Sequence, residues 1–123
     1  MEKIQTENAP AAIGPYSQAM KTGNLLMTSG QIPIDPATGK IEAQDIAGPT
    51  EQVMKNLGAV LQAAGSGYKK TVRTMCFLTD MENFAAFNEV YGKYFTGRPA
   101  RSCVAVSALP KGALVEVELI AEI

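Results

Sequence analysis

One arginine and two glutamates lie in two strand-like segments near the C-terminal end of the sequence. Residues 100–106 carry Arg101, and residues 114–119 carry Glu116 and Glu118. Side chains alternate between the two faces of a strand, so both glutamates share one face of the second segment. A turn of about four residues joins the segments, and we expect a hairpin that brings a carboxylate within reach of the guanidinium. This pattern predicts a site for a small anion.

Both residue types suit such a site, and each also has a simpler explanation. A planar guanidinium matches a carboxylate with two parallel hydrogen bonds and stays charged at any cellular pH. The alternative for Arg101 is a structural ion pair with one of the glutamates. A glutamate in a partly dry cleft activates water when desolvation raises its pKa toward neutrality. The alternative for Glu116 is a solvated position on an edge strand, and composition does not decide between the two.

The absence of histidine excludes several kinds of catalysis. Ser-His-Asp and Cys-His mechanisms, histidine general bases and zinc sites that contain histidine all need that side chain. The two cysteines, Cys76 and Cys103, do not have the spacing of metal ligands, so we expect no metal and no cofactor. Cys103 follows Arg101, whose charge favours a thiolate. We nevertheless interpret Cys103 as a structural wall of the site and Cys76 as a core residue.

Length, composition and charge indicate one soluble globular domain. A chain of 123 residues, 46% hydrophobic and 19% charged, fits a single domain. No apolar run reaches the ~20 residues of a membrane span. A net charge of −1, without a run of basic residues, gives no signal for nucleic acid. The first residues lack the pattern of a secretory signal, so we expect a cytoplasmic protein with reduced thiols.

Hydrophobic periodicity predicts an α+β fold, a sheet of about five to six strands with two helices on one face. The expected elements are a short strand near residues 3–5, a hairpin of residues 17–21 and 25–29, a helix over residues 50–64 that ends at Gly65, a central strand over residues 71–79, a second helix from Asp80 to residues 97–99, and the two C-terminal segments. The sheet face that carries Glu116 and Glu118 is suited neither to water nor to a core. We therefore expect an oligomer to cover it.

Four motifs in this sequence resemble the RidA/YjgF family of enamine/imine deaminases. The motifs are residues 8–17, 28–33, 84–88 and 100–104, in the order that the family shows, and the match runs from about Gln5 to Ile120. The resemblance implies a single RidA-like deaminase domain over residues 1–123 with a chorismate-mutase-like fold. It also implies a homotrimer with a ligand cleft at each subunit interface.

The resemblance further implies roles for individual residues. The matching arginine, Arg101, binds the substrate carboxylate, and the matching glutamate, Glu116, activates the attacking water. Glu118 is assigned a structural role. The other positions that match cleft residues of the family, through side chains or backbone amides, are Tyr16, Ser29, Gly30, Asn88 and Cys103.

These positions also have ordinary structural explanations. Ser29 and Gly30 suit the end of a strand that enters a turn, and Asn88 suits a helix residue that faces solvent. Only the resemblance favours a place in the cleft for them.

We therefore expect a cofactor-free deaminase that hydrolyses reactive 2-imino and enamino acids. Its substrates would be 2-iminopropionate, which derives from 2-aminoacrylate, and 2-iminobutyrate, and its products 2-keto acids and ammonia. One alternative is a non-catalytic module that binds a small carboxylate metabolite and regulates a partner protein. A second alternative is an endoribonuclease, a label that some family members carry. The slightly acidic charge and the lack of histidine argue against RNA cleavage.

Overall fold

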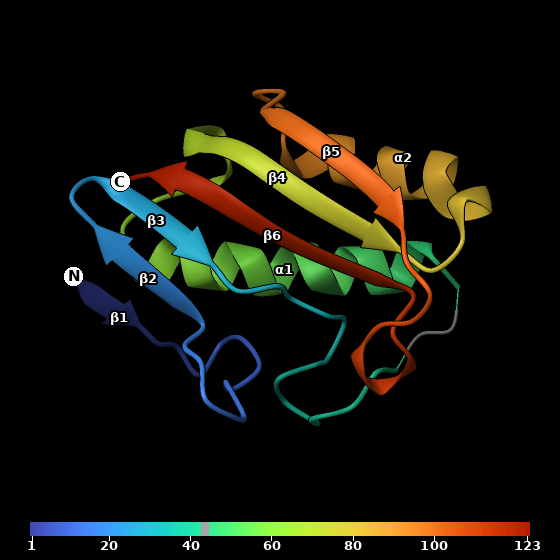
Figure 1. The fold of residues 1–123 in the computed structure, drawn as a ribbon, viewed down its shortest axis with the longest axis horizontal. Helices are drawn as coiled ribbons and strands as arrows, with labels where there is room; N and C mark the ends of the chain where they lie inside the picture. The colour runs from blue at the N-terminus through green and yellow to red at the C-terminus, as the bar shows by residue number, and fades with distance from the viewer. Residues whose placement is uncertain (43–44) are drawn as a thin grey trace.

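A computed structural model describes residues 1–42 and 45–123, which form one six-stranded sheet and two α-helices. The sheet order is β1-β2-β3-β6-β4-β5. The strands are β1 (Glu2–Ile4), β2 (Ala19–Thr22), β3 (Leu25–Thr28), β4 (Thr71–Leu78), β5 (Ala100–Ala105) and β6 (Val115–Glu122). The helices α1 (Ala47–Ala63) and α2 (Phe84–Tyr94) lie behind the sheet in Figure 1, on the same face. The predicted fold class is confirmed.

Local sequence signals locate the β2–β3 hairpin and the C-terminal end of α1. β2 and β3 form the predicted hairpin, and its turn passes through Gly23 at a φ of 57°. Gly65, at a φ of 79°, follows α1, and the Ser66 amide donates to the Leu61 carbonyl at 2.8 Å. This arrangement is a Schellman motif, which ends a helix with glycine because glycine adopts a positive φ without strain. The start of α1 differs from the prediction, because the helix begins at Ala47.

The second helix occurs as predicted but is shorter. A 3-10 turn (Met81–Asn83) precedes it, and α2 ends at Tyr94, before residues 97–99. The Asp80 side chain accepts a hydrogen bond from the Glu82 amide at 2.9 Å and caps the turn that leads into α2. An aromatic stripe along this helix packs into the core. Its residues are Phe84, Phe87, Tyr91, Tyr94 and Phe95. Phe87 and Phe95 are fully buried. Burying each of these rings contributes about 1.5–3 kcal/mol to folding. No helix among residues 1–42 and 45–123 is long and apolar enough to cross a membrane.

The predicted hairpin between the two C-terminal strands is wrong. β4 lies between them, pairing in parallel with β5 and antiparallel with β6. A crossover through a helix, here α2, makes the strands that it joins parallel, so β5 joins β4. The link between β5 and β6 crosses the end of β4, where the Val106 amide donates to the Leu78 carbonyl at 2.8 Å.

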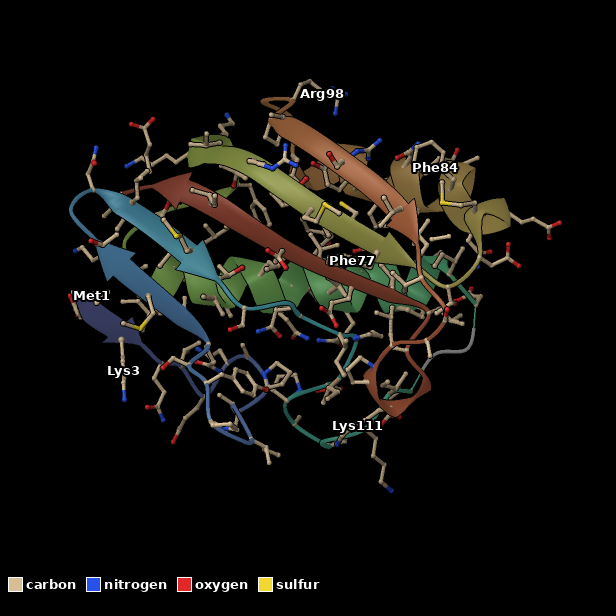
Figure 2. The ribbon with its side chains drawn as sticks, viewed as in Figure 1. Met1, Lys3, Phe77, Phe84, Arg98 and Lys111 are labelled. Atoms are coloured by element: carbon tan, nitrogen blue, oxygen red, sulfur yellow. The ribbon has the colours of Figure 1, made fainter. Side chains whose placement is uncertain are left out.

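The strand register decides which face of the sheet each side chain takes. Arg101 is the register partner of Thr74, which is completely buried toward the helices. Glu116 is the partner of Phe77, and both lie on the face that no helix covers, where Figure 2 labels Phe77. Glu118 lies on that same open face. In one copy of the chain, Arg101 and Glu116 therefore lie on opposite faces of the sheet. The prediction that the guanidinium reaches one of the two carboxylates within the chain is wrong.

Candidate functional site

Three side chains of α2 fix the guanidinium of Arg101. Its Nη1 donates to Asn88 Oδ1 at 2.7 Å. Its Cζ lies 4.8 Å from the ring centroid of Tyr91 and 5.4 Å from that of Phe84. Spacings of four and three residues put these three side chains on one face of the helix. The guanidinium is thus stacked and oriented, while the Asn88 contact occupies only one of its nitrogens.

A buried hydrogen bond in turn fixes the ring of Tyr91. The Tyr91 hydroxyl lies 2.7 Å from Thr74 Oγ1, and both residues are buried. Burial raises the pKa of Tyr91, more than the Thr74 hydrogen bond and the nearby arginines lower it. Tyr91 is therefore a neutral, rigid surface under the Arg101 cation.

The side chain of Arg101 borders a hollow of about 370 Å³. Its lining residues are Asn88, Tyr91, Gly92, Arg98, Pro99 and Arg101. This volume lies at the lower end of the range for pockets that bind small molecules. Hollows of about 460 and 490 Å³ occur at the N-terminal loop and beside Tyr68, and neither is lined by Arg101 or Glu116. The hollow beside Arg101 combines space with a fixed positive charge.

Glu116 forms a second centre on the open face. Desolvation raises the pKa of its half-buried carboxyl, and the negative charge of Glu118 raises it further. The carboxylate lies so close to Gly30 that a Cβ added at that position would overlap it. The close approach explains glycine at this position, because any side chain there would displace the carboxylate.

Gly30, which lies against Glu116, also borders a small hollow. Tyr16, with 54% of its surface exposed, and Gly30 line a hollow of about 140 Å³. Ser29 Oγ donates to the Ser17 carbonyl at 2.6 Å, and the Ser29 amide donates to the Gln18 carbonyl at 2.9 Å. The hydroxyl of Ser29 therefore stabilises the end of its strand. This is the structural role that the sequence offers for Ser29 as the alternative to a place in the cleft.

The cysteines are unsuited to nucleophilic chemistry. Burial raises the pKa of Cys103 more than the positive charge of Arg101 lowers it. Burial also raises the pKa of Cys76, the register partner of Cys103, to about 12. Arg101 thus has the predicted effect on the Cys103 thiol, but desolvation outweighs it and the thiol stays protonated. Within residues 1–42 and 45–123, no three cysteine, aspartate or glutamate side chains gather as metal ligands.

The structure thus divides the predicted site residues into two groups. Asn88 and Cys103 lie near Arg101. Gly30 lies against Glu116, Ser29 precedes Gly30 in the chain, and Tyr16 lines a hollow with Gly30. The predicted site residues do not include Phe84 and Tyr91, although both rings contact Arg101. Their helical spacing from Asn88 is the signal that indicates a shared face.

Comparisons with known proteins identify the family. The family model described as endoribonuclease L-PSP matches residues 6–123. A RutC family protein from Sinorhizobium fredii is 52% identical over 121 residues, which cover 98% of this chain and 96% of that protein. A chloroplastic protein of Arabidopsis thaliana, named Reactive Intermediate Deaminase A, is 47% identical over 98% of this chain and 65% of its own length.

A solved structure agrees with these sequence relatives. The crystal structure of a protein of the conserved Rid family from Yersinia pestis has a TM-score of 0.96 and 52% identity, covering 99% of this chain and 98% of that one. The chain belongs to the RidA/YjgF family.

Proposed function

We propose that this protein hydrolyses 2-imino and enamino acids, such as 2-iminopropionate from 2-aminoacrylate and 2-iminobutyrate, to 2-keto acids and ammonia. The observation that carries the proposal is the Arg101 guanidinium, bonded to Asn88 and stacked on Tyr91 at the edge of a hollow. A fixed planar fork of this kind recognises a carboxylate. The name of the Arabidopsis relative, a reactive intermediate deaminase, supports the same class of reaction.

The reaction needs a held substrate and one base. Arg101 binds the carboxylate, and Glu116 accepts a proton from a water molecule as its oxygen bonds to the imine carbon. Glu116 returns this proton to the nitrogen of the adduct. The carbon–nitrogen bond then breaks while the hydroxyl group gives its own proton to water and becomes the keto group, and ammonia leaves. The raised pKa of Glu116 suits a base that must also return a proton. Because a protonated imine is already electrophilic, orientation supplies most of the acceleration, and the proposal includes no cofactor.

The remaining predicted residues complete the proposed cleft. Asn88 orients the guanidinium, and the backbone amides of Gly30 and Cys103 contact the substrate. Ser29 shapes the strand end beside Gly30, and Tyr16 covers the side of Glu116. The free thiols of the two cysteines suit the cytoplasm, where we place the protein.

The proposal requires more than one copy of the chain, because the two central residues lie on opposite faces of the sheet. The open face supports this requirement. It carries exposed apolar side chains, with Met27 45% and Val104 40% exposed, beside the half-buried Glu116. Apolar surface next to a carboxylate with a raised pKa favours contact with a second copy of the chain. We propose a homotrimer in which each cleft combines Arg101 of one subunit with Glu116 of the next.

A coupled assay tests the proposed activity. A dehydratase generates 2-aminoacrylate from serine, and the release of pyruvate and ammonia is followed with and without this protein. We expect acceleration with the wild type and with Lys55→Ala, whose lysine is exposed on α1, but none with Arg101→Ala. Binding of 2-keto acids without any acceleration would contradict the proposal and favour a non-catalytic carboxylate-binding module.

A further inference from the structure

The hollow beside Arg101 contains a second guanidinium that the proposed function does not use. Arg98 lines this hollow together with Arg101, Asn88 and Tyr91. None of the described residues that line it is acidic. The two positive charges therefore face one cavity without a negative side chain in its wall, so the cavity favours a ligand with two negative groups.

The side chain of Arg98 is fixed at the end of α2. Its Nη1 donates to the carbonyl oxygens of Gly92 at 3.2 Å and Phe95 at 3.3 Å. The last carbonyls of a helix carry partial negative charge and attract a cation. These contacts use one nitrogen and hold the guanidinium at the turn that joins α2 to β5, where Figure 2 labels it. The other nitrogens are available to an anion in the hollow.

The backbone of Arg98 is unusual for a residue with a side chain. Its φ is 53°, in the left-handed region that glycine adopts more easily. An arginine in such a position is strained, and strained residues of this kind gather at binding sites. This backbone closes the turn after α2, where the Arg98 amide donates to the Phe95 carbonyl at 3.1 Å, and it holds the side chain beside the hollow.

We propose that the preferred substrates are 2-imino dicarboxylates, whose side chain ends in a second carboxylate. This inference rests on the proposed function, because Arg101 is taken to bind the carboxylate next to the imine carbon. Arg98 then binds the distal carboxylate, and a cavity of about 370 Å³ accommodates the chain between them. The chemistry is unchanged. Water adds to the imine carbon, the carbon–nitrogen bond breaks, ammonia leaves, and the distal carboxylate takes no part.

Ligand binding to the intact oligomer tests this inference. Calorimetry compares 2-oxoglutarate, a product with two carboxylates, with 2-oxobutanoate, which has one. We expect 2-oxoglutarate to bind about five- to tenfold more tightly, the size of one partly exposed charge-assisted contact. Relative rates of hydrolysis of 2-iminoglutarate and 2-iminobutanoate should follow the same order.

Variants of Arg98 separate recognition from folding. In Arg98→Gln, 2-oxoglutarate should lose about five- to tenfold more affinity than 2-oxobutanoate. Arg98→Gly should have the same effect while it relieves the backbone strain, so a folding defect cannot explain the result. The matched control is Lys55→Gln, which removes an exposed positive charge from α1 and should leave the preference intact.

Two results would overturn the inference. One is that the wild type binds the two ligands with equal affinity. The other is that Arg98→Gln lowers the affinity for both ligands by the same factor. In either case, hydrolysis of 2-iminobutanoate would leave the proposed function standing. Failure of the wild type to bind either 2-oxo acid would overturn the inference and the role of Arg101 together.

Discussion

Arg101 and Glu116 leave opposite faces of the same sheet, two strands apart. Arg101 on β5 points toward α2, where Asn88 accepts its hydrogen bond, and Glu116 on β6 lies on the open face beside Phe77. A small ligand therefore cannot touch both side chains of one chain. Each residue nevertheless has the environment that its proposed role needs: a stacked, fixed cation in one case and a carboxyl with a raised pKa in the other.

Replacement of Arg101 should abolish recognition of the carboxylate. Arg101→Ala removes the charge and should weaken 2-keto acid binding by about 2–5 kcal/mol, the value of a charge-assisted contact in a closed site. Arg101→Lys should restore little, because an ammonium group cannot reproduce the planar fork or its stacking on Tyr91. Calorimetric titration with 2-oxobutanoate measures both effects. Unchanged affinity in Arg101→Ala would show that the arginine is structural.

Replacement of Glu116 should affect turnover instead of binding. Glu116→Gln keeps the shape of the side chain but removes the base, so hydrolysis should slow by about 10²–10⁴. Binding of 2-oxobutanoate should persist. The coupled assay and calorimetry on the same preparation separate the two effects. Normal turnover in this variant, with the oligomer intact, would mean that another group or bulk water delivers the attack.

A methyl group at Gly30 should act through Glu116. The added Cβ in Gly30→Ala overlaps the carboxylate, which must move away from its position. A displacement of this kind should reduce turnover by about 10²-fold. The control is Gly67→Ala, because Gly67 has extended backbone and open space around its Cα. Turnover and thermal melting are measured for both variants. Equal turnover in Gly30→Ala and Gly67→Ala would contradict this explanation.

The acid side of the pH profile should depend on Glu118. A base works only when deprotonated, so kcat/KM should fall as the pH falls through the raised pKa of Glu116. Glu118→Gln removes a repulsive negative charge, which lowers that pKa and moves the acid limb to lower pH. Glu122→Gln, farther along the same strand, should leave the limb unchanged. An acid limb that stays in place in Glu118→Gln would exclude Glu116 as the titrating base.

Most of the fold could be predicted because its signals are local. Gly65 ends α1, Gly23 turns the β2–β3 hairpin, and Asp80 caps the turn before α2, each through contacts a few residues away. The pairing of β5 was missed because short sequence separation from β6 suggested a hairpin. The helix between β4 and β5 decides otherwise, because a strand–helix–strand crossover favours a parallel pair.

The sequence predicts individual residues of the site but not how they are arranged. Charge and strand periodicity are enough to single out Arg101 and Glu116, but the choice of face depends on β4 lying between their strands. The close approach of Gly30 to Glu116 joins segments far apart in the chain, so no local pattern reveals it. The sequence pattern does not single out Tyr91, because its ring packs in the aromatic core and also contacts the guanidinium.

The most direct test of a cleft shared between subunits is complementation between two inactive variants. Arg101→Ala and Glu116→Gln chains are expressed together in equal amounts, and light scattering checks that each sample has a mass near three times 13.1 kDa. A cleft between an intact Arg101 of one subunit and an intact Glu116 of the next then forms at about a quarter of the interfaces in a cyclic trimer. The mixed oligomer should recover about that fraction of wild-type activity, although each variant alone is nearly inactive. Activity of the mixture no higher than the mean of the two variants would contradict a site assembled from two chains.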